Sequence, residues 1–303
     1  MVTAGYGVSP CGDGGYRFFC GMSGVVSRLL ETISQKPNVD VRFSCRVDNL
    51  EMASGDKSCK SRPFPAVKVR FFRLAEGTFD EMVVNFVVVA VPPALVAHTI
   101  SFDPPLDEER RKIMKATPIW MGDAGKVAVV YERPFWRENG FSGTGMSDIG
   151  PLRQVWDNST VWAKDGTEGL TSTYALAGFV FGSDLRILKS EELVRNHVLK
   201  QLGEMYGEEA LTPLAVHFKA WCDEVYTSPS ATVIAKTGDS TRSLPRPSLQ
   251  CGFGHPLTFQ KWGDGVVFAS TETVARENGH MNGAVTSGLR AAREILQLLN
   301  EGI

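Results

Sequence analysis

The sequence predicts an α/β protein with a mixed β-sheet, because short apolar runs of strand length are followed by segments with helical periodicity. The apolar run Val266–Ala269 is long enough for one buried central strand and too short for a helix. From Gly279 onward apolar residues recur every three or four positions, which predicts a helix. The predicted buried face of that helix consists of Met281, Ala284, Val285, Gly288, Ala292, Ile295, Leu296 and Leu299.

The polar segment Ser270–Thr273 joins this strand to the helix, so a strand end, a loop and a helix start are predicted to meet. Free backbone N–H groups and the helix dipole would favour an anion there. Small residues on the near side of the helix would let a flat group or another backbone approach. Tight packing of helix on strand explains the same residues about as well. They are Gly279, Gly283, Ala284, Ser287 and Gly288.

Upstream of residue 100 the sequence continues the mixed pattern. One apolar helix face is predicted between Val25 and Ile33, and Val39–Phe43 and Val67–Leu74 alternate as strands. Val83–Val91 is a nearly continuous apolar run, which predicts one strand buried on both faces. It has to end at the two prolines that follow it.

The character of the sequence changes near Ala116, where we predict a domain crossing. Lys126 enters an alternating strand that places Val127, Val129 and Tyr131 on one face. A lysine buried in that strand would cost free energy unless it were paired. A lysine at a strand end would instead extend its ammonium group to water, and both interpretations remain open.

Three further segments have local signals. The charge run Asp107–Lys115 is predicted to be the solvated face of a helix. Thr171–Phe181 is predicted to be a strand. Ser190, followed by two glutamates, is a predicted N-cap for a helix that continues to Tyr206.

The composition is that of an ordinary globular protein, since 303 residues with 43% hydrophobic and 22% charged side chains allow one large core or two smaller ones. A formal charge of −2 without a basic face argues against nucleic-acid binding. The six cysteines form no C-x-x-C pair and no zinc spacing, so we expect no metal site and a reducing, cytoplasmic compartment. No basic leader or membrane-length apolar run occurs, so we expect a soluble protein without a membrane partner.

The segment Phe268–Glu294, with its T-E-T, G-x-M-x-G-A-V and G-x-R-A-A-R-E patterns, resembles the C-terminal signature of the flavin-containing amine oxidases, the monoamine oxidase family. The V-V-A-V-P-P and I-S-F-D-P-P-L stretches are similar to that family as well. The resemblance implies an FAD/NAD(P)-binding-like fold with FAD as cofactor and an amine as substrate. It implies a flavin domain from residues 14–113 and 224–303, and a substrate domain from residues 114–223 built on a mixed β-sheet.

The resemblance also implies roles for individual residues. Lys126 matches the lysine that holds a water beside the flavin N5, and the backbone N–H of Met281 would stabilise the reduced ring. Val47 would lie against the adenine, although a plain sheet residue is the simpler interpretation of it. Trp221 would pack beside the cofactor, although an isolated tryptophan is more often a core residue. The other implied cofactor contacts are Thr271, Glu272 and Gly279.

Three positions depart from the family pattern. Ser230 stands where the monoamine oxidases carry the cysteine bonded to the flavin, so we expect FAD to be bound non-covalently. Ala231 and His280 stand where they carry the two tyrosines that cage the amine. These two positions are the candidate substrate contacts, and His280 is either a base, a polar substrate contact or a surface histidine.

The largest departure is the missing dinucleotide fingerprint. Each Gly-x-Gly in the chain lacks the third glycine of G-x-G-x-x-G, so the pyrophosphate contacts are not encoded. The resemblance, over residues 20–300, is therefore to the C-terminal portion of a longer protein. Three explanations remain open: an oxidase whose start is missing, a partner chain that supplies the dinucleotide unit, or a binding or scaffold module without catalysis. We expect the isolated chain to have little activity.

Overall fold

The computed structural model describes residues 7–8, 14–15, 21–52, 66–163, 170–188, 190–229 and 254–301. The chain divides into two compact units. The first unit comprises residues 1–41 and 123–221, and the second comprises residues 42–122 and 222–303. The predicted division at residues 113 and 223 concerned binding roles, and it stays a prediction.

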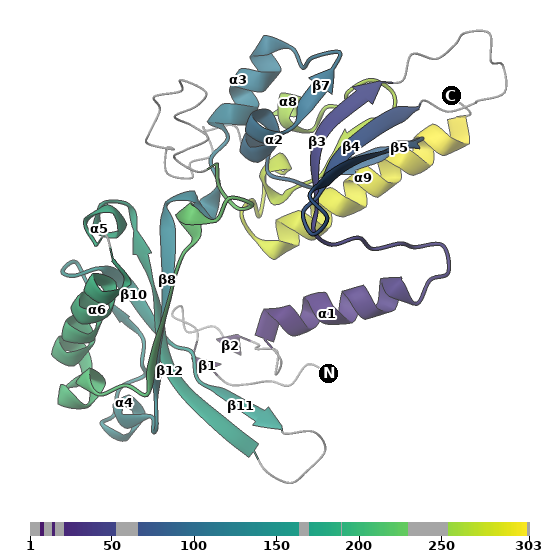
Figure 1. The fold of residues 1–303 in the computed structure, drawn as a ribbon. Coiled ribbons are helices and arrows are strands. Elements are labelled where there is room, and N and C mark those ends of the chain that lie inside the picture. The colour runs from purple at the N-terminus through teal and green to yellow at the C-terminus, as the bar shows by residue number, and fades with distance from the viewer. Residues whose placement is uncertain are drawn as a thin grey trace, which may run out of the picture. The chain divides into compact units, whose positions relative to one another are not determined.

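The first unit is built on a six-stranded antiparallel sheet with the order β13-β8-β12-β10-β9, in which β11 also pairs with β12 (Figure 1). Its strands are β8 (Ala124–Tyr131), β9 (Gly145–Met146), β10 (Leu152–Asp157), β11 (Thr160–Ala163), β12 (Leu170–Phe181) and β13 (Ala215–Ala220). Its helices are α1 (Gly21–Ser34), α4 (Phe135–Glu138), α5 (Gly182–Ile187), α6 (Glu191–Tyr206) and the short η2 (Glu208–Leu211). The two-residue strands β1 (Gly7–Val8) and β2 (Gly14–Gly15) pair with each other.

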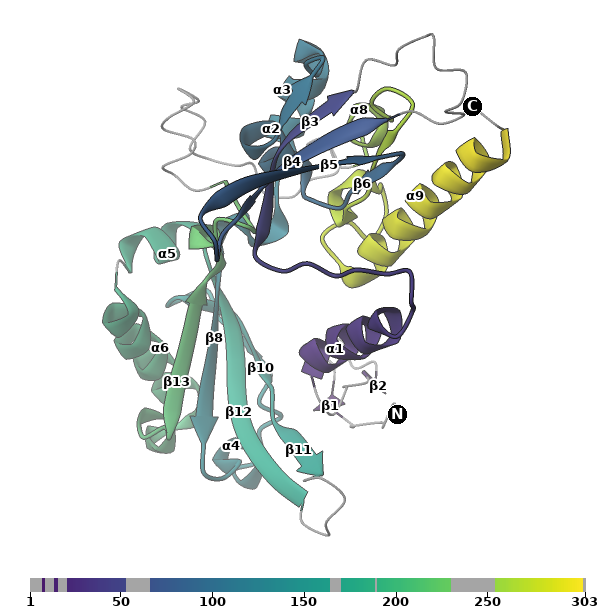
Figure 2. The same cartoon turned by 45° about the vertical axis from the view of Figure 1, so that its right-hand side comes forward.

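Helix α6 covers one face of the six-stranded sheet (Figure 2). Val194, Val198 and Leu202 of α6 are buried in one core with the odd-numbered residues of β8 from Val127 to Tyr131. This confirms the predicted alternation of β8. The predicted strand from residue 171 and the Ser190-capped helix to Tyr206 are confirmed too, since the Ser190 side chain accepts a hydrogen bond from the Leu193 N–H.

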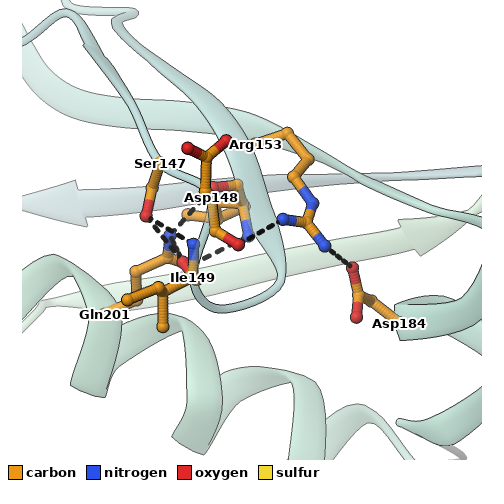
Figure 3. A network of polar contacts seen from close by, with 7 residues as sticks. Ser147, Asp148, Ile149, Arg153, Asp184 and Gln201 are labelled. Carbon is orange, nitrogen blue, oxygen red and sulfur yellow. Dashed lines mark hydrogen bonds and ion pairs between the residues drawn. The ribbon is translucent and has the colours of Figure 1, made fainter.

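A buried glutamine ties α6 to the loop before β10 (Figure 3). The Gln201 side chain donates to the carbonyls of Ile149, at 2.7 Å, and Leu152, at 2.8 Å, and accepts from the Leu152 N–H at 2.8 Å. Gly150 passes over this amide with φ +83, and a Cβ there would lie 2.6 Å from the Gln201 side chain. Close approach and backbone conformation therefore both require glycine at position 150.

The second unit contains two sheets. A four-stranded sheet has the order β5-β4-β3-β7, and β6 pairs in parallel with β14. The strands are β3 (Cys45–Met52), β4 (Val67–Arg73), β5 (Thr78–Val84), β6 (Val87–Val89), β7 (Ser101–Asp103) and β14 (Val266–Phe268). The helices are α2 (Pro93–Thr99), α3 (Glu108–Ala116), α8 (Pro256–Phe259), the short η4 (Thr271–Thr273) and α9 (Met281–Glu301), yellow in Figure 1. Two short turns, η1 (Trp120–Asp123) and η3 (Trp221–Asp223), lie where the chain passes between the units.

Strand β14 is buried on both faces, as predicted. Val266 and Phe268 belong to the core formed with β3 and β4, whereas Val267 and Ala269 pack against Ala291 of α9. The β3–β7 pair is parallel and the β3–β4 and β4–β5 pairs are antiparallel, so the unit has the predicted mixed character.

The prediction of one doubly buried strand at Val83–Val91 was wrong. The run is two strands in different sheets, because β5 ends at Val84 and β6 begins at Val87. Val83 is 53% exposed and Val88 44% exposed. A short break at residues 85 and 86 carries the chain from the antiparallel sheet to the parallel pair, and an apolar run alone does not reveal such a break.

The predicted strand Val39–Phe43 was also wrong, since β3 begins only at Cys45. Ser44 has φ 55, a left-handed conformation that interrupts an extended strand. Phe43 is 72% exposed, so no apolar neighbour holds this segment in a sheet.

The predicted buried face of α9 was displaced around the helix. The buried residues of this helix include Ser287, Ala291 and Leu298. Much of the predicted face lies instead on the exposed flank, comprising Met281, Val285, Leu289, Leu296 and Leu299. The apolar arc of α9 is wider than the surface that β14 covers, so periodicity alone could not select the buried half.

Arg110 departs from the prediction that Asp107–Lys115 is only a solvated face. Its side chain is 3% exposed and its guanidinium lies 4.5 Å from the centre of the Phe268 ring. It donates hydrogen bonds to the carbonyls of Gln260 and Lys261. Burial lowers the pKa of Arg110 to about 10. This residue therefore joins α3 to the segment before β14.

Replacement of Arg110 by methionine should destabilise the protein by about 1–3 kcal/mol, because it leaves two carbonyls without their donor. Urea unfolding would measure the loss. Arg111→Met on the same helix removes an exposed arginine, and we expect it to change stability by no more than about 0.5 kcal/mol. Equal effects of the two substitutions would contradict the assigned role of Arg110.

Candidate functional site

The loop between β14 and α9 brings together several of the predicted cofactor residues. The Thr271 hydroxyl donates to the carbonyl oxygens of His280, at 2.9 Å, and Glu277, at 3.3 Å. Glu277 has φ 57 and Gly279 has φ 72, so two left-handed residues turn the chain back toward Thr271. Thr271, Gly279, His280 and the start of α9 therefore form one compact group.

The glycines of α9 have different roles. A Cβ on Gly283 would lie 2.2 Å from the Glu277 carbonyl oxygen and 2.7 Å from the Thr271 hydroxyl oxygen. A Cβ on Gly288 would have no neighbour within 4 Å. The chain's own loop thus occupies the space beside Gly283, which supports the packing interpretation at that position.

The start of α9 is suited to an anion. Backbone N–H groups in the first turn of a helix have no carbonyl partner within the helix, and the helix dipole adds partial positive charge there. The first turn contains no acidic residue, and Met281 is 60% exposed. A negatively charged group approaching this end would therefore meet donors without meeting a carboxylate.

Glu272 is buried in this loop, with 3% of its surface exposed. Burial raises the pKa of Glu272, and hydrogen bonds from its own backbone N–H and from Ser270 partly oppose that shift. Its Oε2 atom has no hydrogen-bond partner within the described residues. A hydroxyl of a bound group could donate to this oxygen, so the loop fits a polyhydroxylated ligand beside the anion-binding helix start.

His280 is exposed, and its ring is oriented by the loop. Nδ1 lies 2.9 Å from the Asn278 carbonyl oxygen, a contact in which the ring nitrogen must donate. The proton of the neutral ring is therefore on Nδ1. This places His280 beside the exposed helix start, as predicted, while its role as a substrate contact stays a prediction.

Lys126 lies in the first unit, on the sheet face opposite α6. Its Nζ atom is 5.7 Å from the centre of the Trp156 ring and 5.6 Å from that of Phe179. The side chain is exposed, so the high free-energy cost of a buried lysine does not arise. The aromatic rings contribute a cation–π attraction that orients the ammonium group.

Trp221 lies close to this position. Gly125 is directly opposite Ala220 in the β8–β13 pair, so Trp221 follows at the same edge of the sheet. Lys219 is directly opposite Lys126, and its Nζ atom is 5.8 Å from the centre of the Trp221 ring. Sequence reasoning missed Lys219, although it precedes Trp221 by two residues and so shares the alternation of the strand.

The remaining predicted residues do not join either group. Val47 is a half-buried residue of β3 that pairs with Phe71 and packs against the core, as a plain sheet residue would. Ser230 and Ala231 lie outside the described residues. The structure therefore gathers the residues near α9 in the second unit and gathers Lys126 and Trp221 in the first.

Within the described segments, no group of three or more histidine, cysteine or acidic side chains could hold a metal ion. Cys45 and Cys222 are both free thiols. None of the described helices combines the length and the apolar character needed to cross a bilayer.

Comparison with known proteins identifies the closest chemical context of these sites. The sequence matches the family described as flavin-containing amine oxidoreductase over residues 11–296. It is 33% identical to flavin-containing amine oxidase B of Homo sapiens over 222 residues, a match that covers 72% of this chain and 38% of the human protein. The chain thus spans well under half the length of this curated relative.

Solved structures show the same fold. Wild-type putrescine oxidase bound to putrescine is similar with a TM-score of 0.65 and 24% identity, over 93% of this chain and 54% of the oxidase. The cyclohexylamine oxidase of Brevibacterium oxydans is similar with a TM-score of 0.58 and 23% identity, over 84% of this chain and 48% of that enzyme.

Gly283→Ala should destabilise the protein by about 1–3 kcal/mol, because the added methyl group overlaps the Glu277 carbonyl and the Thr271 hydroxyl. Gly288→Ala is the matched control, and it should stabilise the helix by roughly 0.5–1 kcal/mol. Thermal unfolding of both variants would test the assignment. A neutral Gly283→Ala would show that the loop does not lie against α9 as described.

Glu272→Gln should change how stability depends on pH. Because the pKa of Glu272 is raised on folding, its contribution is fully present below the pKa of the unfolded chain and is lost as pH rises through the folded-state pKa. The glutamine variant lacks this loss, so its stability relative to the wild type should increase between about pH 4 and about pH 8. Glu277→Gln, at an exposed position in the same loop, should show no such trend in urea unfolding.

Proposed function

The chain belongs to the flavin-containing amine oxidoreductase family, and from this premise we propose that it forms the ring-binding and substrate-binding portion of an FAD-dependent amine oxidase. The observation that carries the proposal is the acid-free, exposed start of α9 beside Thr271 and the buried Glu272. Residues 14–113 and 224–303 would bind the flavin, and residues 114–223 would bind the substrate.

FAD is the cofactor that family membership implies, and when bound it supplies a hydride acceptor at N5. The proposed reaction removes a hydride from the carbon beside an amine nitrogen and a proton from the nitrogen, which leaves an imine. Water then hydrolyses the imine, and oxygen takes up the two electrons to give hydrogen peroxide.

The residues of this chain would contribute electrostatics and positioning. The Met281 N–H and its neighbours in the first turn of α9 would stabilise the negative charge of the reduced ring. Lys126 would hold a water molecule at the hydride-accepting position, with its ammonium group oriented by Trp156 and Phe179. Thr271 would keep the helix start in place through its bond to the His280 carbonyl.

The fit to FAD is good at the ring end and poor at the pyrophosphate end. The chain lacks the glycine fingerprint that supplies backbone N–H groups to a dinucleotide. We therefore propose that an upstream segment of a longer protein, or a partner chain, supplies that unit, and that Val47 lies near the adenine only in that assembly. FAD would be held non-covalently, since Ser230 replaces the bonding cysteine.

The substrate is proposed to be an amine other than the small arylalkylamines, because Ala231 and His280 replace the tyrosines of the family's aromatic cage. The reducing compartment proposed for the chain is the cytoplasm. A second candidate function, a binding or scaffold module without catalysis, is favoured by the missing fingerprint alone. It predicts that Lys126→Met alters no function of the chain.

Asn282→Asp tests the electrostatic role of α9. The new carboxylate in the first turn should stabilise the helix, while it weakens binding of the reduced flavin by about 0.3–1 kcal/mol and lowers the midpoint potential of bound riboflavin. Asn196→Asp, at an exposed position of α6, is the control and should leave the potential unchanged. Spectroscopic titration with a reductant would measure both.

Riboflavin and FAD should bind this chain with similar affinity, because the pyrophosphate contacts are absent. Visible absorption of the purified chain, before and after addition of each flavin, would measure this. Uptake of neither flavin would reject the ring-binding proposal. An unchanged potential in Asn282→Asp would reject the role of the helix start.

A further inference from the structure

The sheet face opposite α6 in the first unit carries an ordered set of cationic, aromatic and small side chains. Directly opposed residues in antiparallel strands point to the same face of the sheet. Across β12, β8 and β13 one row reads Phe179, Lys126, Lys219. The next row, which extends to β10, reads Trp156, Ala177, Ala128, His217.

The second row places small residues between large ones. Ala177 and Ala128 occupy the two central strands, and Trp156 and His217 stand at the ends. Strands in a sheet are about 4.8 Å apart, so the two alanines leave a shallow trough about two strands wide on this face. One side of the trough is bordered by Lys126 and Phe179 of the adjacent row.

The two lysines place like charges next to each other. Residues directly opposite across an antiparallel pair have Cβ atoms about 4.5–5.5 Å apart, and like charges in this arrangement repel. Each ammonium group lies over an aromatic ring, Lys126 over Phe179 and Trp156, and Lys219 over Trp221. A ligand anion between them would turn the repulsion into two charge-assisted contacts.

We propose that Lys126 and Lys219 bind the carboxylate of the ligand, and that its aromatic or apolar part lies in the trough beside Trp156. Lys219 would thus be a specificity-determining residue that favours amines bearing a carboxylate over simple amines, which would meet two positive charges. Only the statement that this ligand is a substrate rests on the proposed function. The anion site itself depends on the geometry of the first unit alone.

Isothermal titration of the chain with phenylacetate and with its uncharged analogue phenylacetamide tests the proposal without flavin. We expect phenylacetate to bind at least about tenfold more tightly at low salt, and the preference to decrease as salt screens the charges. Lys219→Met should abolish the preference, and Lys219→Arg should retain it. Lys200→Met, which removes an exposed lysine of α6, should leave it unchanged.

Equal affinity for the two compounds in the wild type would overturn the proposal, as would a preference that survives in Lys219→Met. Loss of the preference in Lys219→Arg together with a lowered unfolding temperature would likewise count against direct binding. Flavin uptake is measured separately, so the two proposals can fail independently. A carboxylate preference without flavin uptake would keep the anion site and remove the proposed oxidase function.

Discussion

The burial of β14 on both faces is the constraint on which the second unit depends. Val266 and Phe268 are packed on one side and Val267 and Ala269 on the other. A slip of one residue would reverse both sets of contacts, so the strand has a single position. Arg290 of α9 reinforces it by donating to the Phe268 carbonyl at 2.8 Å and the Thr273 hydroxyl at 3.0 Å. The loop that follows β14 is therefore delivered to the start of α9.

Polar groups are buried close to this strand, and each has a specific arrangement. Arg110 lies over Phe268 and loses part of its preference for the charged form through desolvation, but its hydrogen bonds to backbone carbonyls retain it. Glu272 is buried on the other side of the loop, and desolvation favours its neutral form. A neutral carboxyl near an anion-favouring helix start avoids the repulsion that a carboxylate would exert on a negative ligand.

Local patterns predicted much of the fold, and the failures have a common cause. The alternation of β8, the strand β12 and the capped helix α6 depend on neighbouring residues and were predicted correctly. Val83–Val91 was misread because Asn85 and Phe86 carry no strong turn signal, although the chain changes sheets there. The candidate loop at Thr271 was found through the family resemblance, whereas Lys219 carries no local signal that separates it from a surface lysine.

The sequence by itself determined where helices and strands form, that the chain is an α/β protein of this family, and which residue types stand near the start of α9. Only the tertiary structure decided which half of the apolar arc of α9 is covered, why Gly283 must lack a side chain, and that Lys126 faces Lys219. The physical reason is that periodicity reports the conformation of consecutive residues, whereas register and close approach depend on segments far apart in the chain.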